Sequence, residues 1–101
     1  MGQQRSTPRP AEGLDPMLVT PEVTRIAEKM KKDAEWKLEI KQGYTTYAPL
    51  SYIKKGKTDY CIRVKVDDDQ LIDVCGQYLY TGSVMRVKAK HVTHYDDQIF
   101  F

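Results

Sequence analysis

Apolar side chains recur with the period of an α-helix between residues 20 and 38. Thr20 is a residue type favoured at the N-cap, and Pro21 suits the first helical position, where a missing N–H costs nothing. The apolar positions that share one stripe are Val23, Ile26, Ala27, Met30, Ala34 and Leu38. Lysines and acidic residues fill the other side, so the pattern predicts an amphipathic helix with one buried stripe.

The end of this helix can be interpreted in two ways. Trp36, Leu38 and Ile40 alternate with charged residues, which is also the pattern of a strand. Gly43 is a plausible stop, because glycine is favoured just after the last helical turn. We place the end of the helix at about Leu38 and keep a strand as the alternative for these last residues.

From Tyr44 onward the apolar period changes to two, which is typical of half-buried strands. Strand-like runs occupy residues 44–51, 60–66, 71–75 and 85–91. Turn signals separate them at residues 52–57, which include Gly56, at residues 67–69, and at residues 80–83. Pro49 in the first run indicates an edge position or a bulge. The second half of the chain therefore predicts four strands joined by short turns.

The two middle strands allow a check on register. We assume that the aspartates at residues 67–69 form the loop. The pairs that then lie opposite each other are Val64 with Ile72, Ile62 with Val74, Arg63 with Asp73, and Cys61 with Cys75. The apolar pairs share one face, and the ion pair and the cysteines share the other, as the pleat of a strand requires. This agreement predicts an antiparallel hairpin in that register.

Cys61 and Cys75 become neighbours in this hairpin. A cross-strand disulfide is one outcome of that placement. The sequence, however, carries neither a secretory signal nor a disulfide-dense framework, and a cytoplasmic location is the default for such a chain. We therefore predict a cytoplasmic protein with two reduced thiols on the solvent-side face of the hairpin.

The predicted elements form one small α+β domain. A chain of 101 residues supports one hydrophobic core rather than two. The apolar stripe of the helix is the only cover available for one face of the sheet. We expect the domain over residues 13–101 and a flexible polar tail over residues 1–12. The apolar segment from Leu14 to Val19 is interpreted either as a docking arm or as a lead into the domain.

Charge and composition exclude several classes of function. The 16 basic and 14 acidic residues leave a formal net charge of +2, whereas nucleic-acid binders usually show a dominant basic excess. No apolar run approaches the ~20 residues that a membrane-spanning helix needs. We therefore expect no nucleic-acid partner and no membrane span. We also expect a monomer, with a domain-swapped dimer as the alternative state.

Catalytic and metal-binding motifs are not found in the sequence. The chain has no Gly-rich phosphate loop, no nucleophile elbow and no zinc-protease signature. Its two cysteines and two histidines do not follow a usual zinc spacing. On a strand, His91 and His94 point to opposite faces and do not share a metal ion. We therefore predict a binding module rather than an enzyme, with no catalytic residues, no metal and no cofactor.

Several short strings follow one another in a characteristic order. They are Gly13-Leu14, Thr20-Pro21-Glu22-Val23, Gly56-Lys57-Thr58-Asp59-Tyr60, Ile62-Arg63-Val64, Lys88-Ala89-Lys90-His91 and the aromatic end at Phe101. In this order and spacing they resemble the stefins, the intracellular and disulfide-free branch of the cystatin family. The resemblance extends over residues 13–101, which is the whole predicted domain.

This resemblance implies both a fold and a function. The fold is cystatin-like, with one long helix packed against a curved antiparallel sheet of four to five strands. Stefins inhibit papain-like cysteine proteases such as cathepsins, reversibly and without covalent chemistry, by filling the active cleft with a wedge of three segments. The residues implied at the protease contact are Gly13, Leu14, Tyr52, Ile53, Lys54, Lys55, Gly56, Leu79, Tyr80, Thr81 and Gly82.

The first hairpin loop departs from the family pattern. Stefins carry Q-x-V-x-G there, whereas this chain reads Tyr52-Ile53-Lys54-Lys55-Gly56 and keeps only the glycine. A lysine that enters a cleft must be desolvated, which costs free energy unless its charge reaches water or an acid. The alternative function is therefore a non-inhibitory cystatin-fold interaction module. Its basic tip, formed by Lys54, Lys55 and Lys57, would suit an acidic protein surface.

The second hairpin loop, at about residues 80–83, is shorter than in stefins and lacks their Leu-Pro tip. Tyr78, Leu79 and Tyr80 could replace that tip as an aromatic anchor, because tyrosine is favoured at protein interfaces. The other interpretation is that these are ordinary strand residues. The sequence leaves both interpretations open.

Overall fold

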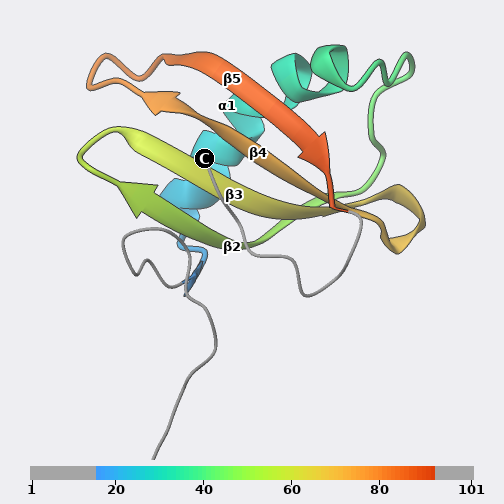
Figure 1. Ribbon diagram of the computed structural model, residues 1–101, viewed down its shortest axis with the longest axis horizontal. Helices are drawn as coiled ribbons and strands as arrows, with labels where there is room; N and C mark the ends of the chain where they lie inside the picture. The colour runs from blue at the N-terminus through green and yellow to red at the C-terminus, as the bar shows by residue number, and fades with distance from the viewer. Residues whose placement is uncertain (1–15, 93–101) are drawn as a thin grey trace, which may run out of the picture.

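The computed structural model describes residues 16–92 of the chain. Helix α1 (Pro21–Lys37) packs on one face of a five-stranded antiparallel sheet. The strands are β1 (Met17–Leu18), β2 (Tyr47–Lys55), β3 (Asp59–Val66), β4 (Leu71–Tyr78) and β5 (Val84–His91). They lie side by side in chain order (Figure 1). The predicted α+β class is confirmed, and the arrangement is consistent with a cystatin-like fold.

Helix α1 begins and ends close to the predicted positions. The Thr20 hydroxyl accepts a hydrogen bond from the Val23 backbone N–H at 3.2 Å, and Pro21 is the first helical residue. The helix ends at Lys37 with Leu38 as its C-cap, well before Gly43. The strand alternative for the last residues is wrong, because Trp36 lies within the helix and points into solvent with 77% of its surface exposed.

The core forms between α1 and the inner face of the sheet, which is the face that the helix covers. Helix residues Val23, Ile26, Ala27, Met30 and Ala34 are all buried, as the apolar stripe predicts. The buried strand residues that join them are Tyr60, Ile62, Val64, Val66, Ile72, Val74 and Val87. Each large aliphatic side chain in such a core contributes about 1.5–3 kcal/mol by burial. This contact fixes which face of each strand is inner.

Tyr47 ties the start of β2 to the helix. Its hydroxyl donates a hydrogen bond to the Ala27 carbonyl at 2.8 Å, and the Lys31 ammonium lies 5.7 Å from the centre of its ring. Burial raises the pKa of Tyr47, with the Glu35 and Glu28 charges adding to the effect. The hydroxyl therefore stays protonated and keeps its role as a donor.

Strand β2 begins at Tyr47 rather than at the predicted Tyr44. The backbone N–H groups of Thr45 and Thr46 donate to the Asp67 carboxylate at 3.2 and 2.6 Å instead of joining a strand ladder. Asp67 opens η2 (Asp67–Asp69), the short 3₁₀ turn between β3 and β4. These bonds satisfy the two N–H groups and attach the segment before β2 to that turn.

The β3–β4 hairpin has the predicted register. Its cross-strand pairs include Val64 with Ile72, Ile62 with Val74, Arg63 with Asp73, and Cys61 with Cys75. The two apolar pairs face the helix and belong to the core. The other two pairs lie on the outer face, opposite the helix, as strand alternation requires.

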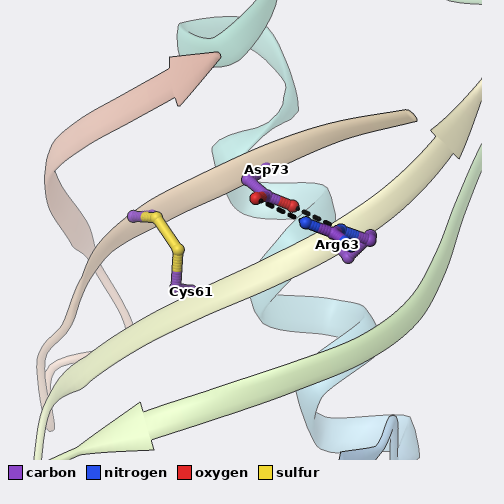
Figure 2. Close-up of a disulfide and its surroundings, with 4 residues drawn as sticks. Cys61, Arg63 and Asp73 are labelled. Carbon is purple, nitrogen blue, oxygen red and sulfur yellow. Dashed lines mark hydrogen bonds and ion pairs between the residues drawn. A yellow bond between two sulfur atoms is a disulfide. The ribbon is translucent and has the colours of Figure 1, made fainter. Parts of the chain in front are cut away.

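The outer face of this hairpin is buried and cross-linked (Figure 2). Arg63 Nε and one terminal guanidinium nitrogen donate to the two Asp73 carboxylate oxygens at 2.9 and 3.0 Å. Only 9% of Arg63 and 1% of Asp73 are exposed. Cys61 and Cys75 form a disulfide beside this pair, so the prediction of reduced, solvent-side thiols is wrong. Directly opposite positions in an antiparallel pair bring two sulfurs within bonding reach.

Two bulges interrupt the ladders. The register of β2 against β3 shifts between Pro49 and Ser51, which confirms the irregularity predicted at Pro49. The register of β4 against β5 shifts between Cys75 and Gln77. The second shift changes which residues of β5 face the helix.

Strand β5 does not keep the regular alternation that the sequence pattern predicts for residues 85–91. A regular strand over residues 85–91 places Met85 and Val87 on one face, but Met85 is 41% exposed whereas Val87 is 6% exposed. Arg86 is the extra residue of the bulge, with a φ of +56°. One inserted residue shifts the in–out alternation of side chains by one position, so residues before the bulge point to the face opposite to the one that a regular strand would give them. Val84 therefore joins Val87 and Ala89 against the core in place of Met85.

Glu35 holds the turn that follows the helix. Its carboxylate accepts hydrogen bonds from the Lys31 ammonium at 2.5 Å and from the Tyr44 backbone N–H at 2.8 Å. Partial burial raises the pKa of Glu35, but these hydrogen bonds and the Lys31 charge outweigh it, so that the pKa lies below its ordinary value. The charged form of Glu35 therefore stabilises the fold.

We predict that Arg63→Met destabilises the protein by about 3–5 kcal/mol, because it leaves the Asp73 carboxylate buried without its bidentate partner. The double variant Arg63→Leu with Asp73→Leu should lose less than Arg63→Met alone, because it removes both charges. Urea denaturation with the disulfide intact measures both values. Equal losses in the single and double variants would contradict this account of the outer face.

We also predict that Glu35→Gln makes the free energy of unfolding depend less on pH below neutrality. A carboxylate with a lowered folded pKa stabilises above its unfolded pKa of about 4.3, and this contribution disappears as the pH falls through the folded pKa. The glutamine amide keeps an acceptor for the Tyr44 N–H but loses the Lys31 ion pair. The variant should be less stable by about 0.5–1 kcal/mol near pH 7. Urea titrations at several pH values should show the difference vanish at low pH; a constant difference would refute the assignment.

Candidate functional site

Two hairpin turns lie at the same end of the sheet. The turn between β2 and β3 spans residues 56–58, and the loop between β4 and β5 spans residues 79–83. Because β2 to β5 run up and down in chain order, these connections share one end and η2 lies at the other (Figure 1). Residues 56–58 and 79–83 together are termed the hairpin edge. It is the first candidate for a binding surface.

Strand β1 begins on the same side of the sheet. Met17 lies opposite Tyr52, and Leu18 lies opposite Ser51. Since the pairing is antiparallel, the first residue of β1 is the one nearer the hairpin edge, and it lies opposite Tyr52, three residues before β2 ends. Met17 and Leu18 are 47% and 84% exposed, so they offer an apolar surface along this outermost strand. Gly13 and Leu14, the predicted contact residues of this segment, lie outside the described residues.

The first predicted loop is mostly strand. Tyr52, Ile53, Lys54 and Lys55 belong to β2, so the turn predicted over residues 52–57 is wrong for its first four positions. The half-buried Tyr52 packs against the core, with its ring centre 6.1 Å from that of Tyr60. Ile53 is buried with the two cysteines on the outer face. These two side chains support the edge and present little or no surface to a partner.

The tip of this hairpin is basic. Lys54, Lys55, Gly56 and Lys57 are exposed. The Lys54 ammonium lies 5.2 Å from the centre of the Tyr60 ring, so this side chain reaches across to β3. Gly56 has a φ of +67°, a conformation that glycine adopts without steric cost, and a Cβ placed there would meet nothing within 4 Å. Backbone at this turn is therefore open to close approach by another molecule.

The second hairpin loop presents an aromatic side chain. The Leu79 N–H donates to the Ser83 carbonyl and the Gly82 N–H donates to the Leu79 carbonyl, both at 2.9 Å. Tyr80 is fully exposed, Thr81 is exposed, and Leu79 and Gly82 are partly buried. The two backbone bonds close the loop, and Tyr80 stands outside it. A fully exposed tyrosine on a closed loop is a suitable anchor for a protein contact.

Residues 16–92 offer little support for a metal-binding site or a membrane-spanning helix. No group of three or more His, Cys, Asp or Glu side chains is placed there to hold a metal ion. His91 is exposed at the end of β5, while His94, Asp96 and Asp97 lie outside the described residues. In the same range, no helix has the length and apolar character that crossing a bilayer requires.

Comparisons of the chain with protein-family models, curated proteins and solved structures gave no match. The stefin resemblance therefore stays a prediction from the sequence. The hairpin edge and β1 are the observations on which a functional proposal can be built.

Proposed function

We propose that this chain is a reversible, non-covalent inhibitor of papain-like cysteine proteases of the cathepsin type. The observation that carries the proposal is a row of three segments: the turn at residues 56–58 and the loop at residues 79–83 share one end of the sheet, and β1 runs alongside the middle of β2. The wedge that the stefin resemblance implies is such a row, with Gly13-Leu14, just before β1 in the chain, as its first segment. The resemblance supplies the class of partner, and the row supplies a surface that can enter a cleft.

Rigidity supports a wedge of this kind. Strand β3, which follows the central turn, and strand β4, which leads into the second loop, are held by the core on one face and by the Arg63–Asp73 pair on the other. The second loop is closed by its own backbone hydrogen bonds. Segments that are already ordered lose less conformational entropy on binding, so more of the contact energy appears as affinity.

The chemistry of the three segments explains how an atypical wedge can still bind. Tyr80 at one flank, and Met17 and Leu18 at the other, offer exposed apolar surface. The basic tip between them is the unfavourable part, because burying an ammonium group is costly. Lys54 lessens this cost, because its ammonium lies over the Tyr60 ring, where a cation–π contact favours it.

Titration of papain and of a cathepsin with this protein, read with a fluorogenic peptide, tests the proposal. Residual activity should fall as the protein is added. Tyr80→Ala, which removes the anchor, and Gly56→Glu, which adds a side chain and a charge where the backbone is open, should each weaken inhibition about tenfold or more. Lys41→Gln, at an exposed site in the connection between α1 and β2, is the control and should inhibit like the parent.

Circular dichroism should show that each variant is folded, since Gly56 has a positive φ. Full protease activity at about 10 μM of the folded parent protein, a free energy weaker than about −7 kcal/mol, would refute inhibition. Inhibition that survives both Tyr80→Ala and Gly56→Glu would refute the hairpin edge as its site.

A second candidate function is a non-inhibitory interaction module that binds an acidic protein surface. The observation that favours it is the exposure of Lys54, Lys55 and Lys57 around one turn. Such a contact should weaken as salt is added, because exposed charges are screened. A pull-down should then retain a non-protease partner that is lost with Lys54→Glu and Lys55→Glu together. A partner retained equally by this double variant would contradict a basic docking site.

A further inference from the structure

The bulge in β5 holds a non-glycine residue in a backbone conformation that favours glycine. Gln77 lies opposite Met85 and Cys75 lies opposite Lys88, so Arg86 and Val87 share the single position across from Gly76. Arg86 has a φ of +56°. An arginine there is less stable than a glycine, because its Cβ crowds the backbone. Non-glycine residues in such conformations are concentrated at binding sites.

The opposite strand is fitted to this bulge. A Cβ added to Gly76 would lie 3.1 Å from the Met30 methyl carbon and 3.3 Å from the Met85 carbonyl oxygen. The helix and β5 therefore approach β4 closely at this point. Bulges of this kind re-aim a side chain at a fixed position, and here the side chain that is re-aimed is Arg86.

A basic hollow opens beside the bulge. Its volume is about 240 Å³, and Arg86 and Lys88 from β5 line it together with Lys55 from β2. Between these strands lie Asp59 of β3 and Gln77 of β4, which are also lining residues. Lys55, Asp59, Gln77 and Met85 form one row across the four strands. Three cationic side chains and one carboxylate thus line the same concave surface.

We propose that this hollow is a binding site for a phosphate group. A guanidinium donates two parallel hydrogen bonds to a phosphate, and an ammonium adds charge and a third donor. The Gln77 amide can donate as well. The proposal does not depend on protease inhibition, since Arg86, Lys88 and Gln77 lie outside the proposed wedge and only Lys55 is common to both sites. The strained Arg86 is then explained as a residue kept for its contact with the ligand.

Titration of the full chain with inorganic phosphate at constant ionic strength, with chloride as the balancing ion, tests this site. Amide chemical shifts should saturate at Gly76, Gln77 and Lys88. Arg86→Gly should weaken phosphate binding at least tenfold and raise the melting temperature, because glycine relieves the strained φ. Lys88→Gln should also weaken binding, whereas Lys41→Gln, with the same loss of charge, should bind like the parent.

Titrations with phenyl phosphate and with acetate test whether the site also binds phosphate esters and whether it prefers phosphate to other anions. Binding of phenyl phosphate at the same amides would extend the site to phosphate esters and support the proposal. Equal binding of acetate would overturn the assignment to phosphate. The site itself would be overturned by shifts that do not saturate, by an Arg86→Gly variant that binds like the parent, or by an equal loss in Lys41→Gln.

Discussion

One helix covers one face of this sheet, and this constraint decides how both faces are built. The inner face of the β3–β4 hairpin can be apolar because α1 seals it, as the fully buried Ile62, Val64 and Ile72 show. The outer face of the same hairpin has no second described helix to pack against. It carries the Arg63–Asp73 pair and the Cys61–Cys75 disulfide instead. Both cross-links join β3 to β4, the strands through which the hairpin edge is attached to the core.

The register of β3 and β4 could be predicted because every cross-strand pair pointed to the same answer. Whether Cys61 and Cys75 are reduced or form a disulfide could not be predicted in the same way. A sequence can make Cys61 and Cys75 neighbours, but the prediction of reduced thiols came from an assumed compartment rather than from the hairpin. Bulges are hidden for a different reason. A single extra residue such as Arg86 leaves no mark except a break in alternation, and Gly76 across from it was the available signal.

The position of the candidate site was more predictable than its residues. Strands that run up and down in chain order must place alternate turns at the same end, so the two hairpin turns meet whatever their sequence. Which residues belong to each turn depends on where pairing stops. The sequence pattern assigns Ile53 to a loop because Lys54, Lys55 and Gly56 follow it, yet it pairs with Cys61 in the sheet. Tyr80 is exposed because β4 ends at Tyr78, a boundary that the alternation did not mark.

These boundaries change what a wedge on this fold can do. In the row of three segments the basic turn at residues 56–58 lies in the middle, with β1 on one side and the loop of Tyr80 on the other. Desolvation opposes burial of the middle, whereas burial of the exposed apolar flanks is favourable. The contact energy of such a wedge therefore shifts from its centre to its sides. A cleft that accepts this wedge must offer apolar surface at two separated places. It must also leave the lysines hydrated or pair them with acids. These requirements are stricter than those of a wedge with an apolar centre.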